Sequence, residues 1–311
     1  MHTSLPRVDQ LFAVILCGCL LLLLGGLVES TDYVPIAVTP EYELKKPQSI
    51  PVILANDDQA TVVSDSLTQV TAASYLVLDL NSGSILISRN IFLPLYPAST
   101  VKLMTALVAL EQYAQTSFLS CHQSMQVAGN KVGLKAGYWM SVEDLLKATL
   151  INSGNDAALV LAHNSQGGYD QFVDKMNQKA SQLSMLQTHF SNPTGLDDPT
   201  QLSSSWDLSL LARAVLNEPQ LMSIVSTKQT SVIEYPTQRE IFLSNTNQLL
   251  NPDDSINGMK TGTTQLAKQV LIASWIWQDH PLLIVVMGSD DRYQDTRLLM
   301  TWVKKFVIWT D

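Results

Sequence analysis

Hydrophobic residues in the first patterned part of the chain follow strand spacing and then helix spacing. Two β-rich runs within residues 74–88 flank an Asn-Ser-Gly turn, which predicts a β-hairpin. The stretch YPASTVKLMTALVALEQ, residues 96–112, then has an almost wholly apolar helical pattern. From residue 112 to about residue 226 most of the chain keeps helical spacing, as in residues 142–151 and 169–183, so this middle part is predicted to be a helical lobe.

The last part of the chain returns to strand spacing. Two β-rich runs at residues 269–277 and 281–288 flank a short Gln-Asp-His sequence, which predicts a second hairpin, and residues 293–309 have the pattern of an amphipathic closing helix. Because strands occur at both ends of this pattern, we expect them to meet in one sheet. The sequence therefore predicts an α/β protein of the α+β type, with a mainly antiparallel sheet flanked by the first and last helices and a helical lobe, about 112–226, inserted between its strands.

An uninterrupted apolar segment, residues 11–28, lies near the N-terminus. Its length is at the lower limit for a helix that spans a bilayer, and Arg7 gives it a weak positive flank. Residues 1–30 are therefore expected to be either a cleaved signal peptide or a retained N-terminal membrane anchor. Residues 31–66, where prolines and polar residues break every period, are expected to form an extended linker, followed by the folded domain at 67–311.

Composition and charge narrow the classes of function. With 311 residues, 46% of them hydrophobic, the chain can bury one large core or two lobes that share an interface. Its charged fraction is 15% and its formal net charge is -9, and it has no visible cluster of cations of the kind that phosphate binding needs. These values argue against a nucleic-acid partner. Cys121 is the only cysteine after the apolar segment, so no disulfide is expected within the exported part.

Lys102 stands three residues after Ser99, at the start of an apolar helical pattern. Positions three apart share a helix face, so the hydroxyl and the amine can come into contact. Apolar surroundings disfavour the charged form of a lysine and lower its pKa, which would let the amine take the serine proton near neutral pH. The helix N-terminus would stabilise negative charge that develops there. The structural alternative is a lysine that extends to solvent from a core helix, with the serine as its N-cap.

Two short motifs further along the chain add polar candidates. The sequence SGN at residues 153–155 opens another helical pattern, and KTG at residues 260–262 comes just before a strand-like run and occurs once. A Ser-x-Asn sequence is a weak signal by itself, because it recurs at Ser88 and Ser255 and because serine is a common helix cap. The three motifs therefore have to be interpreted together and in their order.

In this order the motifs resemble those of the penicillin-recognising serine enzymes, and most closely the low-molecular-mass penicillin-binding proteins, the D-alanyl-D-alanine carboxypeptidases and endopeptidases. The resemblance covers about residues 75–307 and includes the blocks YPASTVKLMTALVALE, VEDLLKATLINSGNDAALVLA, FVDKMNQKASQLSMLQTHFSNPTGLDD and NGMKTGTT. It implies a β-lactamase/transpeptidase-like fold. It also implies a serine-type D-Ala-D-Ala carboxypeptidase that acts on peptidoglycan stem peptides, is acylated by β-lactam antibiotics and uses no metal or cofactor. Such an enzyme would work in the bacterial cell envelope, in the periplasm or at the outer face of the cytoplasmic membrane.

The resemblance assigns a role to each catalytic candidate. Ser99 would be the nucleophile that forms an acyl-enzyme, and Lys102 would be its general base, in agreement with the chemistry expected of the two residues themselves. Ser153 would relay a proton towards the leaving group. Asn155 would hydrogen-bond the backbone amide of the substrate.

The resemblance also assigns residues to substrate binding. Lys260 would further lower the pKa of the catalytic lysine and, with Thr261, would recognise the free carboxylate of a terminal D-alanine. Gly262 would remove a side chain from a strand edge, so that an extended peptide could pair with the backbone; the alternative is a simple turn. The backbone N–H groups of Ser99 and Thr263 would form the oxyanion hole.

Several features leave alternatives open. The family usually has histidine where Gln201 stands and glycine where Lys268 stands, which leaves loop shape and substrate preference undecided. Arg292 either adds a second cation for the carboxylate or forms a surface salt bridge. A β-lactamase is disfavoured because residues 192–205 contain no glutamate to hydrolyse the acyl-enzyme, while a non-catalytic wall-binding protein is disfavoured by the complete motifs. The sequence does not decide between carboxypeptidase and endopeptidase activity, nor does it give the oligomeric state.

Overall fold

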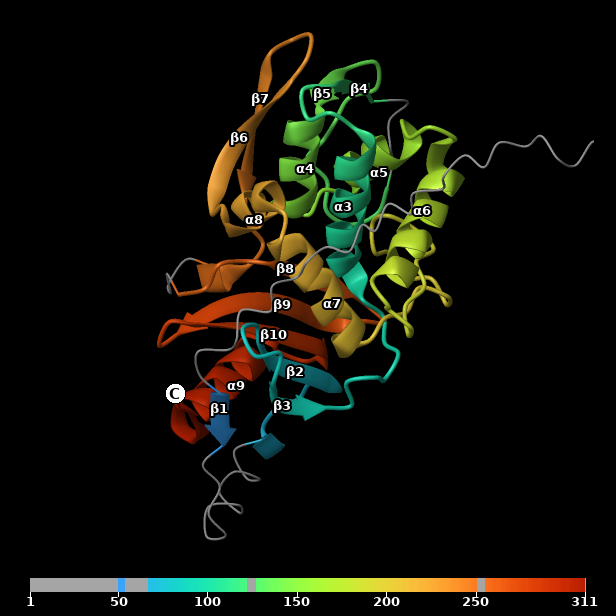
Figure 1. Ribbon diagram of the computed structural model, residues 1–311. Helices are drawn as coiled ribbons and strands as arrows, with labels where there is room; N and C mark the ends of the chain where they lie inside the picture. The colour runs from blue at the N-terminus through green and yellow to red at the C-terminus, as the bar shows by residue number, and fades with distance from the viewer. Residues whose placement is uncertain (1–49, 54–66, 122–126, 251–254, 311) are drawn as a thin grey trace, which may run out of the picture. The chain divides into compact units, whose positions relative to one another are not determined.

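The computed structural model describes residues 50–53, 67–121, 127–250 and 255–310 (Figure 1). All of them belong to one compact unit, Lys46–Asp311. The apolar segment at residues 11–28, with its predicted signal or anchor, lies outside the described residues. Within the described part of the chain, no helix has both the length and the apolar character needed to cross a bilayer.

The centre of the fold is a five-stranded antiparallel sheet in the order β3-β2-β10-β9-β8 (Figure 1). Its strands are β2 (Ser74–Asp79), β3 (Ile85–Arg89), β8 (Lys260–Thr264), β9 (Lys268–Trp277) and β10 (His280–Ser289). Both predicted hairpins are present, and β10 pairs with β2. The two predicted hairpins therefore meet in one sheet, as the sequence predicted, with β8 at one edge.

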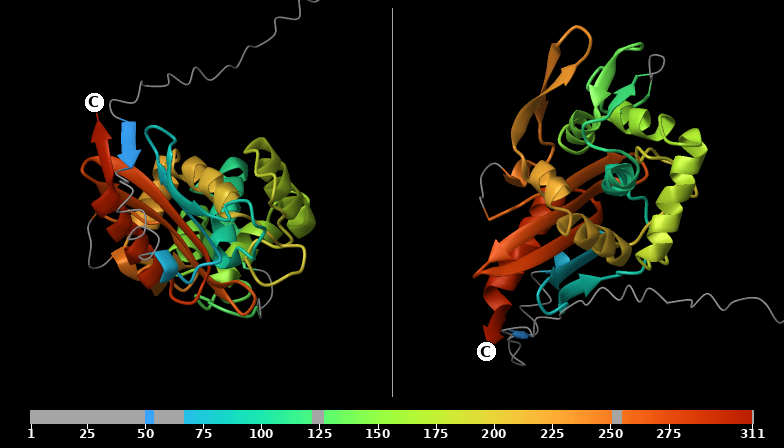
Figure 2. Two further views of the ribbon diagram at one scale, coloured as in Figure 1. Left: turned by 90° about the horizontal axis from the view of Figure 1, so that it is seen from below. Right: turned by 45° about the horizontal axis from the view of Figure 1, so that its top comes forward.

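Helices cover both faces of this sheet (Figures 1 and 2). Helix α7 (Ser205–Leu216) packs on the strands on one face and α9 (Arg292–Phe306) on the other. The other described helices are η1 (Ala98–Val101), α3 (Lys102–Gln112), α4 (Val142–Leu150), α5 (Asn155–His163), α6 (Gly168–Gln182), α8 (Pro219–Ser226) and η2 (Gln248–Leu250). Helices α3 to α8 come between β3 and β8 in the chain, and α9 follows the last strand of the sheet. The predicted α+β fold with an inserted helical lobe is confirmed.

Alternate residues of the central strands enter two separate hydrophobic cores. Leu76 and Leu78 of β2 pack with α3 and its neighbouring helices, whereas Tyr75 and Val77 pack with α9. Successive side chains of a strand point to opposite faces of a sheet, and burying each Leu or Val side chain is worth about 1.5–3 kcal/mol. A sheet covered on both faces therefore explains why β9 and β10 are nearly continuous apolar runs.

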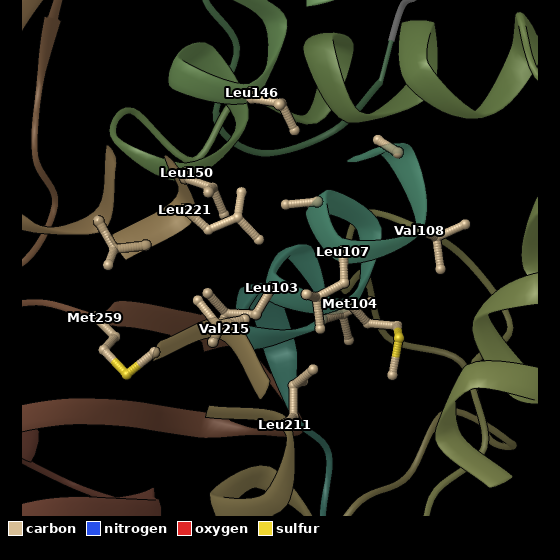
Figure 3. Close-up of a cluster of buried hydrophobic side chains, with 14 of the residues drawn as sticks. Leu103, Met104, Leu107, Val108, Leu146, Leu150, Leu211, Val215, Leu221 and Met259 are labelled. Carbon is tan, nitrogen blue, oxygen red and sulfur yellow. The ribbon is translucent and has the colours of Figure 1, made fainter. Parts of the chain in front are cut away.

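Helix α3 is buried on nearly all sides (Figure 3). Its side chains pack against α4, α7, α8 and the segment before β8 in a cluster that includes Leu103, Met104, Leu107, Val108, Leu146, Leu150, Leu211, Val215, Leu221 and Met259. A helix with neighbours all around it has to be apolar all around, which explains its sequence pattern. The same packing excludes water from the first residue of this helix, Lys102, whose side chain is 0% exposed.

Three two-stranded sheets lie outside the central sheet. In them β4 (Phe118–Ser120) pairs with β5 (Trp139–Ser141), β6 (Gln229–Glu234) pairs with β7 (Arg239–Ser244), and β1 (Ile50–Ile53) pairs with β11 (Val307–Thr310). Strand β1 belongs to the segment that the sequence predicted to be an extended linker. The rest of that segment lies outside the described residues.

The prediction that the closing helix continues to residue 309 is wrong. Helix α9 ends at Phe306, and the chain continues as β11. Trp309 fixes this strand in place: its Nε1 donates to Asp79 Oδ2 at 2.7 Å, and its ring stacks on His280 with centroids 4.1 Å apart. Pairing with β1 and these side-chain contacts therefore override the helical spacing of the last residues.

Candidate active site

Ser99 and Lys102 come together where a 3-10 turn leads into α3. Ser99 lies in η1, and Lys102 is the first residue of the helix. The Lys102 Nζ donates a hydrogen bond to Ser99 Oγ at 3.0 Å and another to the carbonyl oxygen of Thr194. The spacing of three residues thus brings hydroxyl and amine into direct contact.

Burial sets the protonation of Lys102. Removal from water lowers the pKa of its amine well below the usual lysine value, and the positive charge of Lys260 lowers the pKa further. The Asp156 carboxylate acts in the opposite direction and is a smaller effect. A lower pKa leaves more of the amine neutral, and a neutral amine can accept the proton of Ser99. The alternative in which Lys102 extends to solvent is therefore wrong.

Two glycines allow neighbouring segments to lie directly against the backbone of Ser99. A Cβ atom at Gly262 would lie 2.8 Å from the backbone nitrogen of Ser99 and 2.8 Å from Ala98 Cβ. At Gly195, where φ is +84°, a Cβ atom would collide with the carbonyl group of Ala98. The sequence suggested that Gly262 makes room for a substrate, but the atoms nearest to its missing side chain belong to the nucleophile's own segment. Gly262 and Gly195 therefore hold η1 between β8 and the loop before α7.

Ser153 and Asn155 lie at the turn into α5. They are 3% and 4% exposed, and both line the same pocket as Ser99. The Asn155 Nδ2 donates to the carbonyl oxygen of Ala128 at 2.5 Å. This contact orients the carboxamide, because the reverse orientation would bring two oxygen atoms together. Asn155 is therefore a buried residue of the pocket wall, although it begins a helix.

The KTG residues begin the edge strand β8. The buried Lys260 donates from Nζ to the carbonyl oxygen of Thr261 at 3.1 Å. Burial, and then the nearby charge of Arg292, lower the pKa of Lys260 to about 7. Thr261, Thr263 and Arg292 line the pocket, whereas the buried Lys260 does not. Arg292 is therefore the cation that faces the pocket most directly.

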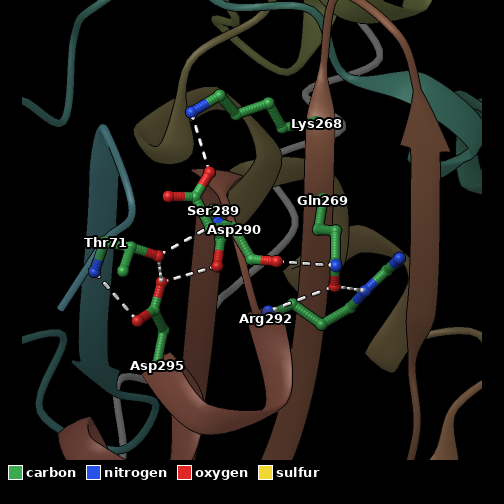
Figure 4. Close-up of polar contacts among 7 residues, drawn as sticks. All are labelled: Thr71, Lys268, Gln269, Ser289, Asp290, Arg292 and Asp295. Carbon is green, nitrogen blue, oxygen red and sulfur yellow. Dashed lines mark hydrogen bonds and ion pairs between the residues drawn. The ribbon is translucent and has the colours of Figure 1, made fainter.

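Arg292, the first residue of α9, donates several hydrogen bonds, and Figure 4 shows those to Gln269. Its Nη1 donates to Gly262 O at 2.7 Å and Val270 O at 3.0 Å, its Nη2 to Thr263 Oγ1, and its Nε to Gln269 Oε1 at 2.9 Å. These acceptors are all neutral. The alternative of a surface salt bridge is therefore wrong within the described part of the chain, and the guanidinium is suited to an anionic group of a ligand.

Lys268, where the resemblance leads us to expect glycine, has a backbone conformation that favours glycine. Its φ is 54°, in the left-handed region that side chains disfavour. Its Nζ forms an ion pair with Asp290 at 2.8 Å, but both side chains are more than half exposed, so the pair contributes little to stability (Figure 4). Gln269, the next residue, donates from Nε2 to Asp290 O at 2.8 Å. Lys268 therefore contacts or adjoins two residues that line the pocket, Asp290 and Gln269.

Gln201, where the resemblance leads us to expect histidine, is buried. Its Oε1 accepts from the backbone N–H groups of Ser191 and Asn192, both at 3.0 Å, and its Nε2 donates to Leu196 O at 2.9 Å. The loop that it closes supplies the Thr194 carbonyl that binds Lys102. Gln201 therefore acts as a structural amide for the loop behind the base.

A pocket of about 610 Å³ joins these groups. It is lined by Ser99, Gly129, Asn130, Ser153, Asn155, Thr194, Gly195, Leu196, Thr246, Gln248, Thr261, Gly262, Thr263, Thr264, Gln269, Asp290, Asp291, Arg292 and Tyr293. Thr246 and Tyr293 were missed from the sequence. The Thr246 hydroxyl is hydrogen-bonded to the Thr261 hydroxyl at 2.7 Å, and Tyr293 Oη donates to Thr246 O at 2.9 Å. No motif marks either residue, because folding alone brings them to the pocket.

No group of three or more His, Cys, Asp or Glu side chains in the described ranges is placed to hold a metal ion. Cys121 is a free, buried thiol, and burial raises its pKa to about 12, with smaller contributions from Glu234 and Asp156. A thiol with this pKa stays protonated and is a poor nucleophile. Cys121 is therefore not a candidate nucleophile.

Residues 59–291 match the family model described as D-alanyl-D-alanine carboxypeptidase. The chain is 31% identical to DacF of Bacillus subtilis across 70% of the chain and 57% of that relative. It is 34% identical to DacD of Escherichia coli across 75% of the chain and 63% of that relative. The alignment with DacB2 of Mycobacterium tuberculosis, at 35% identity, covers 74% of the chain and 81% of that relative. The chain thus spans about 60% of the length of the first two relatives.

Solved structures show the same fold. The D-alanyl-D-alanine carboxypeptidase of Mycobacterium tuberculosis H37Rv superposes with a TM-score of 0.71 and 31% identity, over 76% of this chain and 92% of that one. The Streptomyces K15 DD-transpeptidase superposes with a TM-score of 0.72 over 76% of this chain and 98% of that one, at 23% identity. At this lower identity, the second comparison bears on the fold alone.

Proposed function

The chain belongs to the D-alanyl-D-alanine carboxypeptidase family, and on this basis we propose that it removes the terminal D-alanine of peptidoglycan stem peptides through an acyl-enzyme. One observation carries the proposal: the Nζ of the buried Lys102 lies 3.0 Å from Ser99 Oγ beside a pocket that Ser99 lines. A hydroxyl in contact with an amine of lowered pKa is a nucleophile with its base already in place.

The proposed reaction begins with proton transfer from Ser99 to neutral Lys102. The Ser99 Oγ attacks the carbonyl carbon of the penultimate D-alanine, and the backbone N–H groups of Ser99 and Thr263 stabilise the oxyanion. The bond to the terminal D-alanine then breaks, and the proton passes from Lys102 through Ser153 to the leaving amine. Water adds to the acyl ester, gives a proton back to the Ser99 oxygen through Lys102, and releases the shortened peptide as a carboxylate.

The proposed substrate contacts divide between two sides of the pocket. Asn155 hydrogen-bonds the substrate's backbone on one side, with its carboxamide oriented by the carbonyl of Ala128. On the other side, the guanidinium of Arg292 and the hydroxyls of Thr261 and Thr263 bind the terminal carboxylate, because a charge-assisted contact with a carboxylate is stronger than a neutral one. Lys260, the first residue of β8, adds positive charge mainly below pH 7, since its pKa is about 7.

The surroundings of Lys102 favour a peptidase over a β-lactamase. Its second contact is the backbone carbonyl of Thr194, which cannot activate a water molecule as a carboxylate would. The Asp197 carboxylate of the same loop accepts from Thr264 Oγ1 at 2.5 Å and from the N–H of Leu266 at 3.2 Å. It is thus occupied in holding the turn after β8. We expect slow hydrolysis of a penicilloyl enzyme.

The proposed place of action is the bacterial cell envelope, where peptidoglycan is exposed to an exported enzyme. Residues 11–28 would direct the chain there, either as a cleaved signal or as an anchor. N-terminal sequencing of the protein from a salt-washed membrane fraction distinguishes the two. A start at Met1 in the membrane fraction supports an anchor, because salt does not screen hydrophobic insertion, and a start near Thr31 in the soluble fraction supports cleavage.

Incubation with purified wall peptides, followed by mass analysis of the products, tests the proposed activity. A carboxypeptidase releases a single D-alanine from a pentapeptide, whereas an endopeptidase converts a cross-linked dimer to monomers. Ser99→Ala is expected to abolish both peptide hydrolysis and covalent labelling by a fluorescent penicillin, with an unchanged thermal unfolding midpoint. Covalent labelling that survives in Ser99→Ala would disprove the assignment of the nucleophile.

A further inference from the structure

The backbone of residues 128–135, called here the strap, runs beside the pocket and carries two of its lining residues, Gly129 and Asn130. It has no helix or strand hydrogen bonding of its own. Side chains from elsewhere in the chain hydrogen-bond to its backbone and help to set its position. The side chains that bind the strap come from two elements far apart in the sequence, α5 and the β6–β7 hairpin.

Helix α5 holds the inner part of the strap. The buried Asp156 carboxylate accepts from the N–H groups of Val132 at 3.1 Å, Gly133 at 2.8 Å and Leu134 at 3.1 Å. The neighbouring Asn155 uses its backbone N–H on Asn130 O at 2.8 Å, and its Nδ2 on Ala128 O at 2.5 Å. The orientation of the Asn155 carboxamide therefore depends on where the strap places one carbonyl group.

The β6–β7 hairpin holds the outer part of the strap. The fully buried carboxylate of Glu234, at the end of β6, accepts from the N–H of Lys135 at 2.8 Å. Arg239, at the start of β7, donates from Nε to Glu234 Oε2 at 2.8 Å and from Nη2 to Gly133 O at 2.6 Å. The tip of the hairpin is itself fixed, because Tyr235 and Trp139 exchange two backbone hydrogen bonds of 2.9 and 3.0 Å. The two partners of one ion pair thus bind the strap, Arg239 at Gly133 and Glu234 at Lys135.

From these contacts we propose that Glu234 and Arg239 are positioning residues for Asn155, which they act on through the strap. This inference rests on the proposed function of Asn155 in binding the substrate's backbone. The hairpin binds the backbone of Gly133 and Lys135. Asp156 binds the backbone N–H groups of residues 132–134. The strap, held in this way, presents the Ala128 carbonyl to Asn155. Loss of the hairpin contacts lets this carbonyl shift, and the carboxamide loses its fixed orientation.

The ion pair makes Arg239 the sharper target of the two. Removing the guanidinium leaves the buried Glu234 carboxylate without its cation and Gly133 O without its donor, and an uncompensated buried charge is strongly unfavourable. Glu234→Gln keeps an acceptor for the N–H of Lys135 and removes the charge. Arg239→Met is therefore expected to move the strap more than Glu234→Gln does, with the same direction of effect.

The test compares acylation rates by a fluorescent penicillin in full-length variants. We expect Arg239→Met to lower the second-order acylation rate by roughly tenfold, the size of one lost charge-assisted contact, and Glu234→Gln to lower it less. In an Asn155→Ala background both effects should disappear, because residues that act through one group are not additive. Asp79→Asn is the control: this buried carboxylate also accepts from two backbone N–H groups, of Asn81 and Ser82, and from Trp309 Nε1, but it does not line the pocket.

The outcomes separate the inference from the proposed function. If the wild type and Arg239→Met are acylated at the same rate, the positioning role is wrong and the proposed function is unaffected. Effects that persist in full with Asn155→Ala, or that Asp79→Asn reproduces, also overturn it, since they indicate general destabilisation. A wild-type protein that is not acylated removes the proposed function itself. If Arg239→Met fails to fold, the comparison of Glu234→Gln with and without Asn155→Ala decides the matter.

Discussion

The positive charge of Lys260 lowers the pKa of Lys102, adding to the larger effect of burial. Both lysine side chains are buried, at 1% and 0% exposure, although lysine is among the residues least often found inside proteins. The first supplies like charge and the second supplies the amine that contacts Ser99. The pKa of the proposed base therefore depends on two residues that are 158 positions apart in the sequence.

This relationship predicts a shift in the pH dependence of acylation. Lys102 acts as a base when neutral, so the rate rises as pH passes through its pKa. Replacing Lys260 by Met removes the like charge, raises the pKa of Lys102 towards its usual value, and moves the acid limb of the profile to higher pH. The shift should be largest below pH 7, where Lys260 is charged in the wild type. The measurement is the rate of acylation by a fluorescent penicillin from pH 5 to pH 9, with Lys268→Met as the control that removes an exposed cation. An acid limb of the pH profile that does not move in Lys260→Met, or that moves equally in Lys268→Met, would contradict the prediction.

The buried charge of Lys260 also predicts a pH-dependent cost in stability. Its pKa is about 7 in the fold against an ordinary value of 10.5, so between these values the unfolded chain binds more protons than the folded chain. Stability of the wild type therefore rises with pH from about 7 to 10.5, and the full cost is present below pH 7. Lys260→Met should have a higher thermal unfolding midpoint than the wild type at pH 6, with a difference that shrinks towards pH 10. A wild type more stable than the variant at pH 6 would refute this.

Gln201 predicts a joint loss of stability and acylation rate. Gln201→Ala removes three hydrogen bonds from a buried loop and leaves backbone groups without partners, which should cost about 1–3 kcal/mol in the free energy of unfolding. Acylation should slow as well, because the same loop carries the Thr194 carbonyl that binds Lys102. Urea unfolding and penicillin acylation check the two effects. Gln294→Ala, at an exposed position, is the control and should change neither the stability nor the acylation rate. If Gln201→Ala has the wild-type stability and acylation rate, the loop does not depend on the Gln201 side chain.

Arg292 predicts a preference for substrates with a free C-terminal carboxylate. The wild type should favour the acid over the amidated peptide by about ten- to a hundredfold in kcat/KM, the worth of one charge-assisted contact, and Arg292→Met should lose most of this preference. The two peptides are compared in hydrolysis assays, with the exposed Arg213→Met as control. Equal preference in wild type and Arg292→Met would transfer carboxylate binding to Lys260. Equal rates for acid and amide in the wild type would instead favour endopeptidase cleavage of an internal cross-link.

The sequence by itself determined the sheet, the helical lobe and the contact between Ser99 and Lys102. These features depend on spacing: strand periods at both ends, apolar helical periods in the middle, and a separation of three residues that one helical turn converts into contact. The lowered pKa of Lys102 also followed from sequence, because a helix that is apolar all around has to be buried.

Tertiary structure alone decided which residues support those groups. Thr194 reaches Lys102, Gln201 holds the loop of Thr194, and Thr246 reaches Thr261 only because segments distant in the chain fold against each other. No periodicity encodes such contacts, since they depend on irregular loops whose backbone groups take whatever partners the packing supplies. The same reason applies to the end of the chain, where Asp79 and His280 fix Trp309 in β11 against the helical spacing of its sequence. Local spacing thus determined the elements and the reacting pair, and long-range packing determined what holds them in place.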